Sequence, residues 1–259
     1  MKLKAGCELV LSTAAPVPLV AMLRPRSGEA QWIISERYDL DPFVRVIEYV
    51  DSFGNLCQRL TAPAGKFRIL TEVVVEVTDT ITVGHGAAPG AMEALPNQAL
   101  QFMLPSRYCP SDTLEKLAQE ITNGVAPGYD QVDAIRAWIR DHIQYRYGVS
   151  NGSTSATDTL RDKAGVCRDF SHIGISLCRA LRIPARMAVG YLYQLDPMDL
   201  HAWFEAFIDG RWFTFDATQK EPKGGRITIA YGRDAADVAL LTEFGPLKAD
   251  STRVWVEKL

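Results

Sequence analysis

This chain lacks both an excess of charge of one sign and any long apolar run. Its 259 residues include 28 Lys and Arg against 31 Asp and Glu, which gives a net charge of −3. Nucleic-acid backbones are bound through an excess of basic side chains, so we expect no nucleic-acid partner. No stretch approaches the roughly 20 apolar residues that span a bilayer, so we expect no membrane partner either.

Cysteine is also sparse, and its spacing does not suggest a disulfide framework. The five cysteines contain no Cys-x-x-Cys pair: Cys7, Cys57, Cys109, Cys167 and Cys178. Free thiols are typical of a reducing compartment, and Pro16 and Pro18 interrupt the only stretch that imitates an export signal, so we predict a cytoplasmic protein.

A zinc site is the main chemical alternative. Its candidate ligands are Cys167, His172, Cys178 and His201. We disfavour it because Cys-x4-His-x5-Cys on one helix would splay the ligands around the helix axis. The aspartates also form no calcium-binding loop pattern. We therefore predict no metal and no cofactor.

The composition changes near residue 105. Before it, short β-branched runs alternate with Pro, Gly, Asn and Asp, and the clearest strand is predicted at 72–77 because consecutive β-branched residues disfavour a helix. We predict an N-terminal antiparallel β domain over 1–105 and an α+β core over 106–259.

The predicted core consists of helices followed by strands. Helices are expected at 111–122, from a cap at Asp130 to about 143, at about 155–161, and at 167–182. Strands of one antiparallel sheet are expected at 186–194, 201–208 and 211–216, with the segment 231–240 and the final run 253–258 completing the sheet.

Cys167 opens the last of these helices, directly after the loop 164–166. Unpaired backbone N–H groups and the positive end of the helix dipole favour a thiolate at such a position. A helical cysteine is more often a buried apolar residue, and we interpret Cys178 on the same helix in that way. The role of Cys167 therefore depends on its partners.

A predicted hairpin supplies those partners. If Asp209-Gly210 is a two-residue turn, Ile208 faces Arg211, and His201 and Asp216 become diagonal neighbours on one side of the sheet. Diagonal positions lie roughly 7–8 Å apart at Cα, which an imidazole and a carboxylate can bridge. A one-residue error in register would place them on opposite faces.

Cys167, His201 and Asp216 together would form a nucleophilic triad. His201 would exchange a proton with the thiol and with the leaving amine, and Asp216 would orient the imidazole. The backbone N–H of Cys167 is an oxyanion donor, and Tyr145 and Trp138 are candidates for a second one. We interpret His85, His142 and His172 as structural or surface histidines.

Several blocks of the sequence resemble the bacterial transglutaminase-like superfamily, and they follow the order of that family. They are Tyr145–Tyr147, Ala164–His172, Cys178–Arg186, Gly190–Tyr191, His201–Glu205 and Trp212–Thr218. More loosely, Gly6–Glu8 and Asp51–Asn55 resemble the β-rich domain that often precedes this core in bacteria.

The resemblance implies a papain-like core with Cys167 as nucleophile, His201 as general base and acid, and Asp216 as orienting carboxylate. We expect a peptidase or amidase that acts on a peptide or protein amide through a thioester. One alternative is a protein-glutamine transglutaminase, which needs an amine acceptor as well. A second is a non-enzymatic protein that binds a peptide or partner on the same fold.

Overall fold

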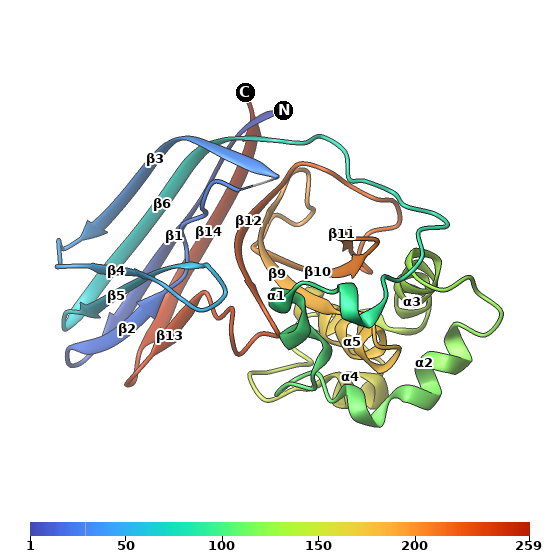
Figure 1. Cartoon of the computed structure of the whole chain (residues 1–259). Helices are drawn as coiled ribbons and strands as arrows, with labels where there is room; N and C mark the ends of the chain where they lie inside the picture. The colour runs from blue at the N-terminus through green and yellow to red at the C-terminus, as the bar shows by residue number, and fades with distance from the viewer. Residues whose placement is uncertain (29) are drawn as a thin grey trace.

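The computed structural model describes residues 1–28 and 30–259 (Figure 1). Two β-rich sheets form one side of the molecule, and the helices gather around a third sheet on the other side. The two chain ends lie together on the β-rich side, where the Leu259 N–H donates to the Lys2 carbonyl (3.1 Å). The predicted α+β class, with antiparallel sheets, is confirmed.

The β-rich side contains two four-stranded antiparallel sheets. The first has the order β14 (Lys248–Lys258), β1 (Lys2–Thr13), β6 (Gly65–Val77) and β3 (Gln31–Asp41). The second has the order β13 (Leu241–Glu243), β2 (Val17–Ala21), β5 (Leu56–Ala62) and β4 (Ile47–Val50). Alternate side chains of β1, among them Leu3, Ala5 and Cys7, are fully buried, as expected for strands with one face toward a core.

The prediction that the final run completes the core sheet is wrong. Strand β14 pairs with β1 instead, with Gly6 opposite Trp255. A Cβ atom at position 6 would lie 2.4 Å from the indole, so Trp255 packs on the bare backbone of that residue. The boundary predicted between residues 105 and 106 stays a prediction. Strands β13 and β14, at the C-terminal end of the chain, belong to the sheets formed by the N-terminal strands.

The third sheet has the order β11 (Arg211–Phe215), β10 (His201–Ile208), β9 (Ala185–Leu192) and β12 (Arg226–Gly232). Ile208 faces Arg211 and Phe204 faces Phe215, so the predicted hairpin register is confirmed. Asp209 and Gly210 both have positive φ (49° and 76°), as a type I′ turn requires. This turn chemistry fixes which side chains of β10 and β11 share a face.

The remaining elements lie between the β-rich strands and the third sheet or around its helical layer. They are η1 (Met92–Ala94), α1 (Asn97–Leu100), η2 (Gln101–Met103), η3 (Ser111–Thr113), α2 (Glu115–Ile121), α3 (Tyr129–His142), β7 (Gln144–Tyr145), α4 (Ala156–Asp162), β8 (Ala164–Gly165) and α5 (Cys167–Ala180). The predicted helix 111–122 is divided, because Leu114 departs from helical geometry. Asp130 lies inside the first turn of α3 and is not its cap.

Helix α5 packs on strand β10 at the centre of this layer (Figure 1). Its residues from Asp169 to Arg179 are all buried. The close approach occurs at Gly174, where a Cβ atom would lie 2.5 Å from the ring of Phe204. The start of α5 and the start of β10 are thereby held in one rigid layer.

Candidate active site

Cys167 is the first residue of α5, as predicted. The extended backbone of Val166 precedes it, and the Asp169 carboxylate accepts a hydrogen bond from the Val166 N–H (2.9 Å). This contact closes the first turn and leaves the Cys167 side chain partly exposed, whereas the other four cysteines are buried. All five are free thiols.

His201 and Asp216 lie together beside this helix end. Nε2 of His201 is 2.8 Å from Oδ2 of Asp216, and both side chains are almost fully buried. The other carboxylate oxygen, Oδ1, accepts from the Thr218 N–H (3.0 Å) and hydroxyl (2.7 Å). Asp216 is therefore fixed on both oxygens, and the imidazole is fixed through Nε2.

The electrostatics favour a charged His201. Burial alone would lower its pKa, but the charge and hydrogen bond of Asp216, followed by contact with the Cys167 side chain, raise the pKa of His201 to about 9. Burial would raise the pKa of Asp216, yet Arg226 and His201 together hold it well below its usual range. The structure thus brings all three predicted triad residues into one interacting group.

Arg226 is a member of this group that sequence reasoning missed. Its Nη2 atom donates to Oδ2 of Asp216 (2.8 Å), and its guanidinium lies 4.9 Å from the ring centre of Trp203. The Trp203 ring in turn lies near-parallel to His201, with 6.2 Å between centroids. The only signal was a charged residue at the start of an apolar alternating run, which did not indicate its partner.

Tyr145, the predicted second oxyanion donor, lies at the same helix start. It belongs to β7, and its ring contacts Phe170 of α5. Burial, then the neighbouring Cys167 and Tyr147 side chains, raise the pKa of Tyr145 well above its usual range, opposed by a hydrogen bond from the Cys167 backbone. Tyr145 therefore lies beside Cys167, whose backbone N–H the sequence indicated as the first oxyanion donor.

Trp138, the other candidate, has a different environment. It lies on α3 and stacks on His142 (4.4 Å between centroids), and the His142 Nδ1 atom hydrogen-bonds to the Trp138 carbonyl (2.8 Å). His85 is exposed and pairs with Asp130. These side chains have local structural partners.

A cavity of about 100 Å³ opens beside His201. Two tyrosines, two carboxylates and the segment after Asp216 line it, and its residues include Tyr145, Tyr147, Asp196, Asp199, His201 and Thr218. Tyr145 and Tyr147 are 41% and 55% exposed. The cavity thus connects the buried His201–Asp216 pair with solvent.

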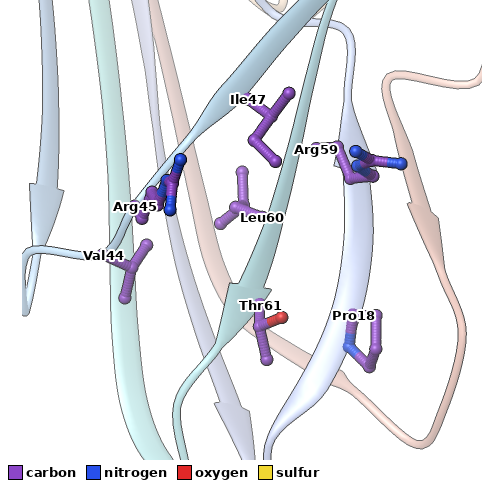
Figure 2. A pocket seen from close by; sticks show the side chains of 7 residues that line it. All are labelled: Pro18, Val44, Arg45, Ile47, Arg59, Leu60 and Thr61. Carbon is purple, nitrogen blue, oxygen red and sulfur yellow. The ribbon is translucent and has the colours of Figure 1, made fainter.

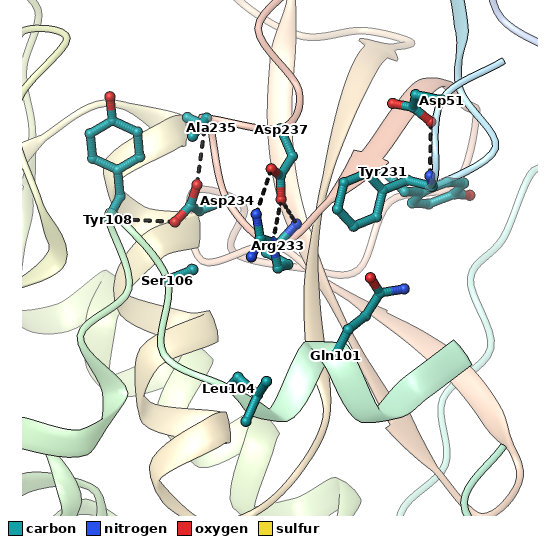
Figure 3. Close-up of polar contacts among 12 residues, drawn as sticks. Asp51, Gln101, Leu104, Ser106, Tyr108, Tyr231, Arg233, Asp234, Ala235 and Asp237 are labelled. Atoms are coloured by element: carbon teal, nitrogen blue, oxygen red, sulfur yellow. Dashed lines mark hydrogen bonds and ion pairs between the residues drawn. The ribbon is translucent and has the colours of Figure 1, made fainter. Parts of the chain in front are cut away.

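His172 has a structural environment behind the candidate site. Its ring stacks on Tyr108 (5.1 Å), and its Nε2 atom accepts from the Ala235 N–H (3.2 Å). Burial lowers the pKa of His172 to about 4, so the ring stays neutral. Asp234 accepts from the Tyr108 and Ala236 N–H groups (2.8 and 2.9 Å), which ties the chain after β12 to this side of α5 (Figure 3).

A larger cavity lies on the β-rich side and not beside Cys167. Its volume is about 380 Å³, and strands β2, β4 and β5 line it together with Val44 and Arg45 (Figure 2). It contains no thiol, imidazole or carboxylate among its lining side chains. Its chemistry is therefore that of an apolar surface with two arginines, Arg45 and Arg59.

The described residues also bear on metals and membranes. Within 1–28 and 30–259, no three His, Cys, Asp or Glu side chains are arranged to hold a metal ion. Of the alternative zinc ligands, His172 and Cys178 are both fully buried within α5. Over the same residues, no helix combines the length and apolarity needed to cross a bilayer.

Comparison with known proteins identifies similar chains. The model of the transglutaminase-like superfamily matches residues 115–217. A solved structure of a proposed cysteine protease from Cytophaga hutchinsonii is 36% identical, with a TM-score of 0.94 over 99% of this chain and 90% of that one. An uncharacterised protein of Mycobacterium leprae is 29% identical over 238 residues, which cover 85% of this chain and 84% of that protein. An uncharacterised protein of Mycobacterium tuberculosis is 26% identical over 245 residues, 83% of this chain and 77% of that protein.

Proposed function

Because the chain belongs to the transglutaminase-like superfamily, we propose that it is a thiol-dependent acyl-transfer enzyme that acts on amide bonds. The observation that carries the proposal is the buried 2.8 Å contact between His201 Nε2 and Asp216 Oδ2 beside the Cys167 thiol. With Nε2 engaged by Asp216, Nδ1 is the ring nitrogen left to exchange a proton with sulfur. A thiol, an imidazole and a carboxylate then have the three separate roles that acyl transfer needs.

In the proposed resting state the proton of the Cys167 thiol already lies on His201, as a thiolate–imidazolium pair. The thiolate attacks the amide carbonyl carbon and forms a C–S bond, while the carbonyl oxygen becomes an oxyanion. His201 then returns the proton to the leaving nitrogen as the C–N bond breaks, which leaves a thioester on Cys167. Water or an amine then attacks the thioester carbonyl carbon and gives a proton to His201. The C–S bond breaks, which releases the acid or the new amide and restores the Cys167 thiolate beside protonated His201.

The oxyanion would lie between the Cys167 backbone N–H and the Tyr145 hydroxyl. Tyr145 lies beside Cys167, so an incoming carbonyl oxygen would lie between the hydroxyl and the backbone N–H and accept from both. The raised pKa of Tyr145 supports this role, because it keeps the hydroxyl protonated as a donor.

We place hydrolysis ahead of transamidation. Tyr145 and Tyr147 line the cavity beside His201 and are themselves exposed, so we expect water to reach the imidazole that would activate it. Transamidation by an amine acceptor is the second candidate, and the Asp196 and Asp199 carboxylates in the cavity wall favour it because they attract ammonium groups. The substrate in both cases is a peptide or protein amide.

The products distinguish these outcomes. The protein is incubated with a peptide library, with and without a primary amine, and the intact mass of the protein and its products is measured. A thioester adduct on wild type, absent from Cys167→Ser, is the expected result, and a released acid or a new amide identifies hydrolysis or transamidation. A protein that binds peptides without any adduct or turnover would contradict the proposal and favour a binding role.

We also propose a cytoplasmic location, on the basis of five free cysteines of which four are buried. Cell fractionation followed by immunodetection tests it. Recovery of the protein outside the cytoplasmic fraction would contradict this location without affecting the acyl-transfer proposal.

A further inference from the structure

Arg226 and His201 share a single oxygen atom of Asp216. The Arg226 Nη2 atom and the His201 Nε2 atom each lie 2.8 Å from Oδ2, whereas Thr218 occupies Oδ1. Arg226 comes from β12, three strands away from the carboxylate it contacts in the order of the sheet. The contact therefore joins the two edges of the third sheet at the triad.

The burial of Arg226 is informative because its charge is directed at the triad. Its side chain is 7% exposed, and its guanidinium covers Trp203, the neighbour of His201 on the same face of β10. Arg179, a second buried arginine, instead donates to backbone carbonyls such as those of Ala185 and Arg233, and so ties loops together. A buried cation that contacts one carboxylate acts on that carboxylate's charge.

We infer that Arg226 is a positioning residue of the proposed triad: it holds Oδ2 of Asp216 in place and limits how strongly that carboxylate retains the proton on His201. The inference rests on the proposed function. The positive charge of Arg226 beside Asp216 disfavours the protonated form of His201. In addition, Oδ2 of Asp216 accepts from both side chains, so only part of its capacity to accept hydrogen bonds is left for His201. Arg226 would thereby keep the imidazolium acidic enough to return its proton to the leaving nitrogen.

Other groups also face His201 and contribute to its protonation. Cys167 approaches from α5, and Asp216 follows β11. Tyr145 and Tyr147 from the β7 segment and Asp196 and Asp199 from the loop before β10 share the cavity that His201 lines. Among these groups Arg226 is the cation in direct contact with the triad carboxylate. Its removal should therefore shift the protonation equilibrium of His201 toward the imidazolium.

The pH profile of Cys167 alkylation by iodoacetamide tests the inference without a substrate. Wild type should show a rate change at low pH, where the thiolate–imidazolium pair forms, and a second one at higher pH, where His201 loses its proton. Arg226→Gln should move the second change upward by about one pH unit, and Arg226→Lys, which keeps the charge, should return it toward wild type. Circular dichroism confirms that each variant is folded.

Arg186→Gln is the matched control. Arg186 also lies on the third sheet, pairs with a buried carboxylate, Glu205 (2.6 Å), and covers aromatic rings, but it does not contact Asp216. Its variant should keep the wild-type profile. A second rate change that stays in place in Arg226→Gln, or shifts equally in Arg186→Gln, overturns the inference. A wild-type profile with the single ionisation of an ordinary thiol would instead overturn the proposed function, so the two failures are distinguishable.

Discussion

At the scale of single residues, Asp216 is where the charges of the candidate site meet. It receives hydrogen bonds from His201 and Arg226 on one oxygen and from Thr218 on the other. A buried carboxylate costs free energy unless it is paired and hydrogen-bonded, and here every oxygen has partners. The Asp216 side chain therefore has a fixed orientation, and its hydrogen bond to Nε2 fixes the orientation of the His201 ring.

This pairing makes stability depend on pH in a defined direction. The pKa of folded His201, about 9, is above the unfolded value, so the pairing stabilises the fold fully below about pH 6.5 and less as pH rises toward 9. We expect the difference in unfolding free energy between wild type and His201→Gln to fall by about 2–3 kcal/mol over that window. Urea denaturation at several pH values measures it, and a constant difference would contradict the assignment.

At the scale of elements, the packing of α5 on β10 determines the positions of the Cys167 thiol and the His201 imidazole, because these are the first residues of the two elements. Gly174 allows this approach, and the Phe204 ring that fills the space is itself stacked on Phe215 (5.7 Å) and cannot easily move away. The helix start and the strand start are therefore coupled through one contact in the middle of the layer.

We expect Gly174→Ala to lower the unfolding free energy by about 1–3 kcal/mol, because overpacking outweighs the gain in helix propensity. Gly152→Ala is the matched control, since a Cβ atom there meets nothing within 4 Å. Thermal and urea denaturation of both variants provide the comparison. If Gly174→Ala proved as stable as the control, the close packing of Gly174 against the Phe204 ring would be contradicted.

The hairpin β10–β11 was predictable from sequence, whereas Arg226 was not. The two residues of the Asp209-Gly210 turn determine the turn type. The register of β10 with β11, and so the position of Asp216, therefore follow from residues close in sequence. The contact of Arg226 depends on the order of strands in the sheet, which sequence periodicity does not specify. For the same reason the partner of the final strand was predicted wrongly.

At the scale of the whole molecule, the β-rich sheets and the third sheet are joined by specific polar contacts. Asn55, next to β5, donates to the Tyr231 carbonyl (2.7 Å) and accepts from the Tyr231 N–H (2.8 Å) on β12. Asp51 holds the Asn55 amide from the other side (2.9 Å), and Figure 3 shows Asp51 beside Tyr231. The strand that carries Arg226 is thus anchored to the β-rich side.

Asn55→Ala should lower the unfolding free energy by about 1–3 kcal/mol, since it removes two hydrogen bonds to a half-buried backbone segment. Asn123→Ala, at an exposed position, should change it by less than about 0.5 kcal/mol. Equal stabilities of the two variants, measured by urea denaturation, would show that this contact does not hold the two parts together.

The most direct test of the central claim is the alkylation rate of Cys167 against pH in wild type and in His201→Ala. If His201 and Asp216 sustain a thiolate, wild type reacts rapidly at and below about pH 7, and His201→Ala reacts at least about tenfold more slowly there, like a free thiol. Identical profiles for the two proteins, both following an ordinary thiol, would contradict the role of Cys167 as an activated nucleophile.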